Sequence, residues 1–312
     1  LRKVTPAHCT PISQGAWADY LKKHFRPHVP SRVGPGPDVG REQAIPIGRG
    51  HDVVDLLRQQ REGVRVQPDV VEPPDLTTIQ GLVARQIGKM NAQASPGFDC
   101  VAAPFIKYAV VQRLRPSGRG YDRVNVLEPY IAQLFKLLFE KARIPDDWKK
   151  AKLAPVYKKG AFLDPNNYRM LAVSGTMYRM YANVLRALIT DWCMSERKIP
   201  DTQFGFCPGR NTLQPLFILR HLQHAARLRT PGRLHAAFID FKQAYDTIPR
   251  QALWQHLQNI RMPAPFLAAI QDMYDGDEYV LKDGDKAAGV HPTTGVKQGC
   301  PLSPLLFSLY IN

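Results

Sequence analysis

Residues 235–250 read HAAFIDFKQAYDTIPR and place Asp240 inside a run of apolar residues. The apolar residues on both sides of Asp240 predict a buried strand. An ionised carboxylate in such a strand destabilises the fold strongly unless a partner compensates its charge. A divalent metal ion is one such partner, because Mg²⁺ is commonly held by one or two carboxylates together with substrate phosphates. We therefore consider Asp240 a candidate metal ligand, whereas for Asp246, six residues later, a capping or structural role is favoured.

The chain has 312 residues and a formal net charge of +15, and this charge is unevenly distributed. Residues 151–235 carry 13 Lys or Arg and 4 Asp or Glu, whereas residues 236–312 carry 6 and 8. A basic block followed by an acidic one suits a protein that holds phosphates with one part and metal ions with the next. A solvated basic surface is the alternative reading of the same charges.

Several classes of protein are not supported by the composition. No apolar run approaches the roughly 18 to 20 residues that span a bilayer, so no membrane partner is expected. No signal-like segment opens the chain, which begins with Leu1, so we expect an intracellular protein that is a fragment. The scattered cysteines form no CxxC pair and predict neither a disulfide framework nor a cysteine zinc site. These cysteines are Cys9, Cys100, Cys193, Cys207 and Cys300.

Helices and strands interleave irregularly along the chain, which predicts an α+β fold. Residues 1–75 are rich in Pro and Gly and predict a loosely ordered extension with one short helix at 15–25. Apolar periodicity predicts helices at 75–87, 126–142, 176–195, 213–227, 250–260 and 264–274, and a further helix in the last ten residues. Asp75 is the expected cap of the first helix, and the expected apolar face of the second consists of Leu127, Ile131, Leu134 and Leu138. Strands are predicted at 152–159, 168–174 and 234–241, with a hairpin at 278–290.

Two further stretches carry candidate binding residues. YKKGAFLDPNNYR at 157–169 places Lys158, Lys159 and Arg169 at the facing ends of a two-stranded unit, which suits a triphosphate. Two exposed basic residues in a hairpin loop are the alternative. GVKQGCPLSPLLF at 295–307 contains Gln298, which can both donate and accept hydrogen bonds, next to Gly299, which allows close backbone approach.

The order of these motifs resembles that of one family of enzymes. The matching pieces are SPGFD at 95–99, the basic unit at 152–169, QFGFCPGRNT at 203–212, AAFIDFKQAYDTIPR at 236–250 and GVKQGCPLSPLLFSLYIN at 295–312. Together they resemble the reverse transcriptase domain of non-LTR (LINE-type) retrotransposons over about residues 80–312.

The resemblance implies the architecture of a right-hand polymerase. It places an N-terminal extension at 1–75, a helical part at 76–150, the fingers at 151–235 and the first half of the palm at 236–312. The implied function is RNA-directed DNA synthesis in the nucleus with an RNA template, a DNA primer and dNTPs. The resemblance does not imply an oligomeric state.

The resemblance also implies roles for the candidate residues. Asp240 corresponds to the first metal-binding aspartate of the palm, with the main-chain carbonyl of Phe241 as a neighbouring ligand. Tyr245 corresponds to the aromatic residue that disfavours a 2′-hydroxyl. The implied chemistry is phosphoryl transfer with two ions of Mg²⁺, for which Mn²⁺ is the alternative.

The remaining site residues contact the nucleotide in this resemblance. Lys158 and Arg169 correspond to the residues of the fingers that grip the incoming triphosphate. Gln298 and Gly299 correspond to the segment beside the nucleotide and template.

Two features depart from the family pattern. Met170 stands where the family usually has proline, and the family's Asp-Asp signature is expected beyond LYIN at 309–312. We therefore expect no polymerase activity from this polypeptide alone. A catalytically dead remnant that at most binds nucleic acid is the alternative, and a basic scaffold or maturase-like RNA-binding protein is a third reading.

Overall fold

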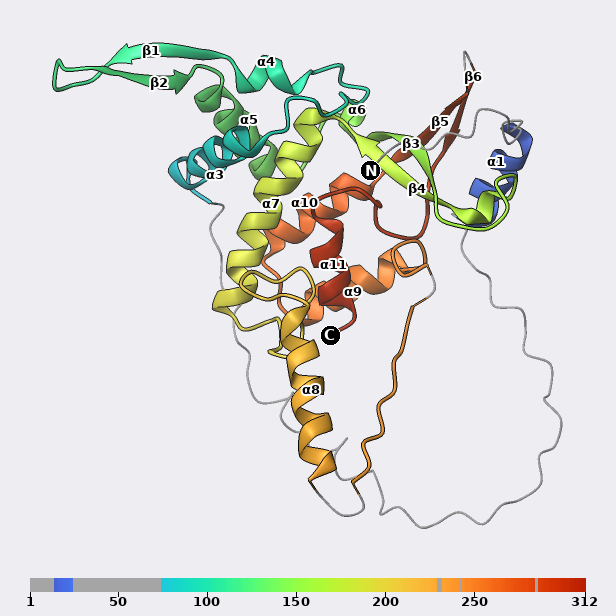
Figure 1. Ribbon diagram of the computed structural model, residues 1–312. Helices are drawn as coiled ribbons and strands as arrows, with labels where there is room; N and C mark the ends of the chain where they lie inside the picture. Colours follow the sequence, from blue (N-terminus) through green and yellow to red (C-terminus); the bar gives the residue numbers. More distant parts are fainter. Residues whose placement is uncertain (1–13, 25–73, 229–231, 242, 284–285) are drawn as a thin grey trace, which may run out of the picture. The chain divides into compact units, whose positions relative to one another are not determined.

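The computed structural model describes residues 14–24, 74–228, 232–241, 243–283 and 286–312. These residues form an α+β arrangement of a helical core, a two-stranded sheet and a four-stranded sheet (Figure 1), which confirms the predicted fold class. They belong to one of two units of the chain, and the other, residues 28–72, lies outside the described residues.

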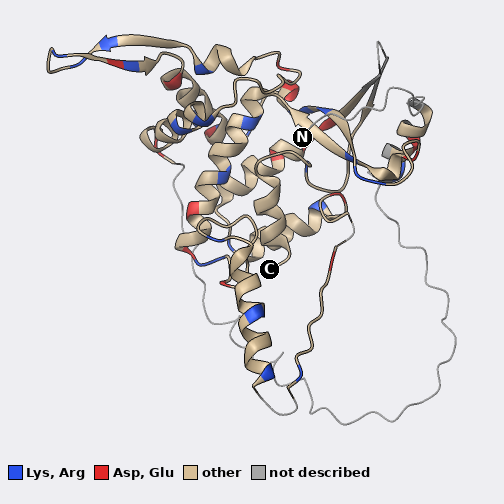
Figure 2. Ribbon diagram, viewed as in Figure 1, with Lys and Arg blue, Asp and Glu red and all other residues tan. Residues whose placement is uncertain are grey.

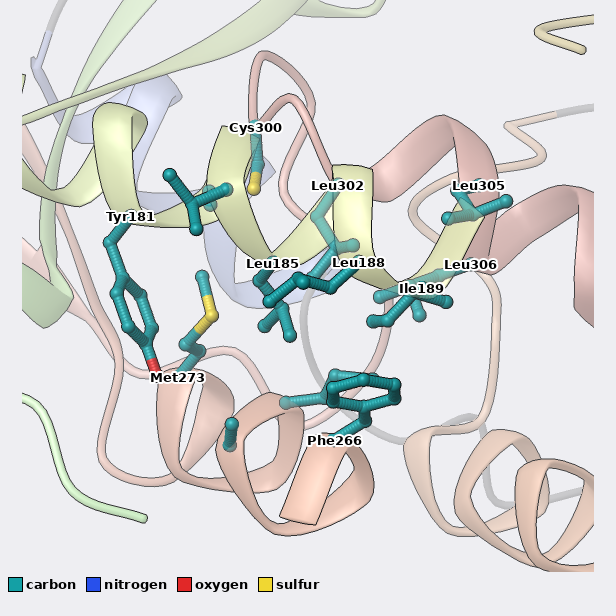
Figure 3. Close-up of a cluster of buried hydrophobic side chains, with 14 of the residues drawn as sticks. Tyr181, Leu185, Leu188, Ile189, Phe266, Met273, Cys300, Leu302, Leu305 and Leu306 are labelled. Atoms are coloured by element: carbon teal, nitrogen blue, oxygen red, sulfur yellow. The ribbon is translucent and has the colours of Figure 1, made fainter. Parts of the chain in front are cut away.

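The helical core packs α3 (Leu76–Lys89), α5 (Glu128–Lys141), α7 (Thr176–Ser195), α10 (Ala264–Tyr274) and α11 (Ser303–Tyr310) around one apolar interior. Figure 3 shows that side chains from α7, α10, α11 and the segment leading into α11 meet in this interior. Residues labelled there include Leu185, Ile189 and Leu306, which are 0% exposed. All five helices were predicted from apolar periodicity, and burial of these apolar stripes is the main source of their stability.

Two local predictions about these helices have different outcomes. The Asp75 carboxylate accepts a hydrogen bond from the Thr78 amide at 2.8 Å, so the predicted cap of α3 is confirmed. The predicted apolar face of α5 is partly wrong, because Leu134 is 36% exposed and Phe135 is 0% exposed. Phe135 points inward because its ring packs against Tyr181 at 5.3 Å, which the helix periodicity of α5 alone does not reveal.

A four-stranded sheet stands beside the helical core. Its order is β4 (Tyr168–Ser174), β3 (Lys150–Tyr157), β5 (Glu278–Asp283), β6 (Lys286–Val290). The β3–β4 and β5–β6 pairs are antiparallel, whereas β3 and β5 pair in parallel. The strands predicted at 152–159 and 168–174 and the hairpin predicted at 278–290 are therefore confirmed, although the tip of the β5–β6 hairpin lies outside the described residues.

Helix α1 (Gln14–His24) covers one face of this sheet, which confirms the short helix predicted at 15–25. Trp17 of α1 is 7% exposed and packs edge-on against Tyr168 of β4 at 5.3 Å between ring centroids. Met170 belongs to the same apolar cluster and continues the β4 ladder opposite Pro155. The residue that departs from the family pattern is thus a buried strand residue under α1.

The predicted strand at 234–241 is wrong. Residues 232–241 adopt no regular secondary structure, and Phe238 and Ile239 are each 85% exposed. A strand needs a neighbour for its hydrogen-bond ladder, and no described strand pairs with this segment. Asp240 is therefore an exposed residue here, and the charge does not lie among buried apolar side chains.

Shorter elements connect the core and the sheet. They are α4 (Ala103–Lys107), β1 (Val110–Leu114), β2 (Tyr121–Asn125), α6 (Asp146–Lys149), the 3-10 turn η1 (Pro165–Asn167), α8 (Leu213–Arg227) and α9 (Arg250–Asn259). The β1–β2 hairpin was not predicted and lies within 76–150, where only helices were expected. Within the described ranges, no helix has the length and apolar character needed to cross a membrane.

Candidate functional site

The seven residues to which the family resemblance assigns a role line one cavity of about 640 Å³. These residues are Lys158, Arg169, Asp240, Phe241, Tyr245, Gln298 and Gly299. The rest of the lining consists of Gln243, Ala244, Asp246, Cys300, Ser303 and Pro304. The structure thus brings together residues that are up to 141 positions apart in the sequence, from Lys158 to Gly299.

The basic side of the cavity comes from the β3–β4 hairpin. Lys158 directly follows β3, and its amide donates to the Asn167 carbonyl at 2.8 Å, which closes the base of the connecting loop. Arg169 lies on β4 opposite Val156, so both cations belong to the same end of the hairpin. Within the described part of the chain neither cation forms an ion pair, so both charges are available to an anionic ligand. Lys159, which was predicted beside them, does not line the cavity.

Asp240 contributes an exposed carboxylate to the same cavity. Among the described residues it has no hydrogen-bond or ion-pair partner, so its oxygens are free to bind a cation. The neighbouring Phe241 is anchored by its ring, which packs edge-on against Phe307 of α11 at 6.3 Å between centroids. This contact connects the exposed segment to the helical core at the residue beside the carboxylate.

Asp246 and Gln298 form the polar contact that sequence reasoning missed. The Gln298 Nε2 atom lies 2.7 Å from both carboxylate oxygens of Asp246. Because a carboxylate only accepts, the contact fixes which end of the amide faces Asp246. The Gln298 carbonyl oxygen, Oε1, is therefore the end left to accept a hydrogen bond from a ligand. The spacing of Asp246 from Asp240 was visible in the sequence, but its partner lies 52 residues away.

Gly299 lies against the edge of the sheet. The main-chain amide of Ala172 in β4 donates to the main-chain carbonyl of Gln298 at 2.6 Å, and this bond joins the Gln298–Gly299 segment to the strand. Gly299 has φ +114°, and a Cβ atom there would lie 2.8 Å from the Ala172 carbonyl oxygen. Both the backbone conformation and the available space thus require glycine at this position.

Tyr245 forms a half-buried wall of the cavity. Its ring stacks on Phe307 at 5.3 Å with an interplanar angle of 21°. Its carbonyl accepts from the Val296 amide at 2.8 Å, which holds residues 245 and 296 side by side. Partial burial raises the pKa of the Tyr245 hydroxyl, so the side chain remains neutral at physiological pH.

A buried ion network supports the segment that presents Gln298. Arg250 binds the Asp277 carboxylate through two nitrogens at 2.7 and 3.0 Å and donates to the Gly295 carbonyl at 3.0 Å. Lys297 is 0% exposed, and its ammonium donates to the carbonyls of Lys149 and Met273. Burial lowers the pKa of Lys297, and the nearby Asp277 carboxylate opposes that shift.

Helix α1 lies within electrostatic reach of the same site. The pKa of Tyr20 is raised to about 12, first by burial and then by the carboxylates of Asp246 and Asp164. Since Tyr20 packs against the sheet cluster that also contains Ala172 of β4, α1 supports the strand that borders the cavity.

The SPGFD motif has a structural position away from the cavity. The Asp99 carboxylate accepts from the Met177 amide at 3.0 Å and so caps the first turn of α7. Gly97 allows the chain to pass Gly175, because a Cβ atom at Gly97 would lie 2.4 Å from the Gly175 Cα atom. This motif therefore fixes the start of α7, the central helix of the core.

The fit of a divalent ion rests on Asp240. Among the described residues no group of three or more His, Cys, Asp or Glu side chains could hold a metal ion. Mg²⁺ is nevertheless often bound by one or two carboxylates with substrate phosphates and water completing the shell. The Asp240 carboxylate lines the same cavity as Lys158 and Arg169, which suits an ion that arrives together with a triphosphate.

Comparison with known proteins identifies the family. Residues 156–312 match the family "Reverse transcriptase (RNA-dependent DNA polymerase)", which is half of the chain. The chain belongs to the reverse transcriptase family. This match begins near the end of β3, at Val156, and includes every residue that lines the cavity.

Relatives come from mobile elements. The chain is 29% identical over 224 residues to the transposon TX1 uncharacterized 149 kDa protein of Xenopus laevis, which covers 72% of this chain and 16% of that protein. It is 22% identical over 231 residues to a probable RNA-directed DNA polymerase from transposon BS of Drosophila melanogaster, covering 73% and 24%. It is 24% identical over 260 residues to the RNA-directed DNA polymerase from mobile element jockey of the same species, covering 82% and 26%.

These matches confirm the resemblance to reverse transcriptases of non-LTR elements. The matched region corresponds to only about a sixth to a quarter of the length of these relatives.

Proposed function

We propose that this chain carries the nucleotide-binding part of an RNA-directed DNA polymerase of a non-LTR element. One observation carries the proposal: seven residues chosen for nucleotide and metal binding line a single cavity of about 640 Å³. A volume of this size lies within the range of small-molecule sites, which is roughly 300–1,000 Å³. The proposed substrates and partners are dNTPs, an RNA template and a DNA primer.

The charges of the cavity suit a triphosphate. Lys158 supplies a point charge and Arg169 a planar fork, and neither is neutralised by a described carboxylate. Asp240, with the Phe241 carbonyl, would hold a divalent ion, with Mg²⁺ proposed and Mn²⁺ as the alternative. When bound, the two metal ions of this family would stabilise the charge that develops in phosphoryl transfer and would activate the primer hydroxyl.

The remaining residues determine how the nucleotide lies. We propose that the Tyr245 ring, held by Phe307, packs under the sugar and excludes a 2′-hydroxyl. Asp246 fixes the Gln298 amide so that Oε1 accepts a hydrogen bond from a donor on the nucleotide. These groups are held before the ligand arrives, and such positioning is the main contribution of a protein to phosphoryl transfer.

The architecture is proposed to be that of the fingers and the first half of the palm of a right-hand polymerase. The β3–β4 hairpin and the helices up to residue 235 would form the fingers. Residues 236–312 would form the palm portion, with 76–150 preceding both and 1–75 as an extension. The basic block at 151–235 would contact the phosphate backbone of the template, so template binding would weaken as salt increases.

Equilibrium binding of dTTP in the presence of Mg²⁺ tests the proposal on this chain. Loss of one charge-assisted contact costs about 1.5–3 kcal/mol, so Lys158→Gln should raise Kd by about tenfold or more. Lys159→Gln is a matched control, because this exposed neighbour carries the same charge and does not line the cavity.

The proposal also predicts a dependence on Asp240. Asp240→Asn should remove the contribution of Mg²⁺ to dTTP affinity while leaving metal-free binding unchanged. Equal effects of Lys158→Gln and Lys159→Gln would show that dTTP is attracted by general positive charge, and would refute a nucleotide site in this cavity.

A further inference from the structure

The hairpin formed by β1 (Val110–Leu114) and β2 (Tyr121–Asn125) has no part in the cavity described above. Residues 111–124 are all exposed, so the ribbon contributes no side chain to the buried core. Figure 1 shows it extending outward from α4 and the start of α5. An isolated two-stranded hairpin is at best marginally stable in water. Since burial in the core does not account for this exposed hairpin, we consider a role for it in binding.

The ribbon is held together by its own cross-strand contacts. Val111 pairs with Val124 on one face, and Leu114 pairs with Tyr121 on the other. Such apolar pairs each contribute roughly 0.2–1 kcal/mol. Its base is fixed by Asn125, whose Nδ2 atom donates to the Ile106 carbonyl at 2.7 Å. The apolar residues of the hairpin therefore stabilise the pairing of its strands while remaining exposed, and the charged residues beside them are also presented to solvent.

Those charged residues are mostly arginine, and they lie on both faces. Arg113 is on the face that contains Val111, whereas Arg123 is on the opposite face with Gln112. Arg115 and Arg119 flank the turn, and Arg115 pairs with Asp122 at 2.8 Å. Within the described residues the other three arginines form no ion pair, and Figure 2 shows basic residues along both strands and the turn of the hairpin.

A ribbon with cations on both faces fits a groove with phosphates on both walls. The major groove of B-form DNA is about 12 Å wide and admits a two-stranded ribbon, whereas the A-form RNA major groove is too narrow for side chains to read. We propose that the β1–β2 hairpin is an arm that enters the major groove of double-stranded DNA and binds its phosphates. This inference rests on the hairpin itself and does not require the cavity to bind nucleotides.

The test measures binding of the full chain to a DNA duplex of about 20 base pairs by fluorescence anisotropy between 50 and 200 mM salt. The variant carries Arg113→Gln, Arg119→Gln and Arg123→Gln together. Each lost phosphate contact lowers the slope of log K against log salt by about 0.9. We expect the slope to fall in magnitude by about 2 to 3 and the affinity to fall at least about tenfold at 150 mM salt.

Two controls separate the arm from general charge and from misfolding. The triple variant Arg85→Gln, Lys141→Gln and Arg261→Gln removes the same charge from exposed positions on α3, at the end of α5 and after α9, outside the basic block at 151–235, and should change the slope by less than half as much. Replacing residues 111–124 by Asn-Gly joins Val110 to its paired partner Asn125, so it should retain the melting temperature and lose DNA affinity as the hairpin triple variant does.

Each outcome decides the proposal. An unchanged affinity and slope for the hairpin variants, or an equal loss in the control triple, would overturn it. A larger loss for double-stranded RNA or single-stranded DNA of the same sequence than for duplex DNA would overturn the groove assignment. A change in oligomeric state in place of DNA binding would show a protein-binding ribbon. Binding of dTTP should be the same in all these variants, so failure here is distinguishable from failure of the nucleotide site.

Discussion

Substitution of Asp277 tests how the segment before Gln298 is held in place. The Asp277 side chain is 1% exposed and faces Arg250, which is 11% exposed, and Lys297, which is 0% exposed. The Asp277→Asn variant keeps the shape of the side chain and removes the charge that compensates both cations. Because Arg250 and Lys297 also bind main-chain carbonyls around the segment, the loss is transmitted to the cavity wall.

The expected cost is large for a single substitution. Removing one partner of a buried ion pair costs about 3–5 kcal/mol, because an uncompensated charge remains in the interior. For a domain of this size about 1 kcal/mol lowers the melting temperature by about 2–4 °C. The Asp277→Asn variant should therefore melt about 6–20 °C below the parent chain.

Urea unfolding, followed by tryptophan fluorescence and by circular dichroism, measures the difference in the free energy of unfolding between the variant and the parent chain. Asp147→Asn is the matched control, because Asp147 pairs with Lys150 at 3.0 Å but is 79% exposed. Exposed ion pairs contribute about 0–1 kcal/mol, so this control should be nearly neutral. The double variant Asp277→Asn/Lys297→Met should be more stable than the sum of the single losses predicts. A loss below about 1 kcal/mol for Asp277→Asn would refute the buried network as the support of the segment.

Three further predictions concern other parts of the site and core. Tyr245→Ala should raise the affinity of the cavity for UTP relative to dTTP, and an unchanged ratio would exclude Tyr245 as the sugar-discriminating residue. Gly299→Ala should destabilise the chain by about 1–3 kcal/mol in urea unfolding, because its positive φ is strained for alanine and because the added Cβ atom would clash with the Ala172 carbonyl oxygen. By contrast Gly88→Ala, with nothing within 4 Å in α3, should stabilise it by about 0.5–1 kcal/mol; the opposite order would contradict both arguments. Burial raises the pKa of Cys193 to about 12, so iodoacetamide at pH 8 should label exposed Cys100 far faster, as peptide mass spectrometry would show.

Local sequence rules predicted most of the regular elements. The core helices have apolar residues at helical spacing, and Asp75 and the prolines before α9 and α10 mark helix starts. The seven cavity residues were also identified, because motif order placed them together although their spacing in the sequence is wide. The helices are encoded within short stretches of chain, whereas the cavity residues were identified from the order of motifs along the chain.

The features that were missed depend on partners distant in the sequence. Segment 234–241 has the composition of a strand, but it is exposed because no described strand pairs with it. The β1–β2 hairpin shows no apolar alternation toward a core, since both of its faces are exposed. The role of Asp246 required knowledge that Gln298 lies beside it. Composition indicates what a segment can form, and tertiary contacts decide what it does form.

Photo-crosslinking with an azido-substituted dUTP, followed by peptide mapping, tests the central claim most directly. The label should attach to peptides that contain residues 158–169, 240–246 or 298–304, and unlabelled dTTP should compete for it. Attachment to α8 or the β1–β2 hairpin, or labelling that dTTP does not reduce, would contradict a nucleotide site in this cavity.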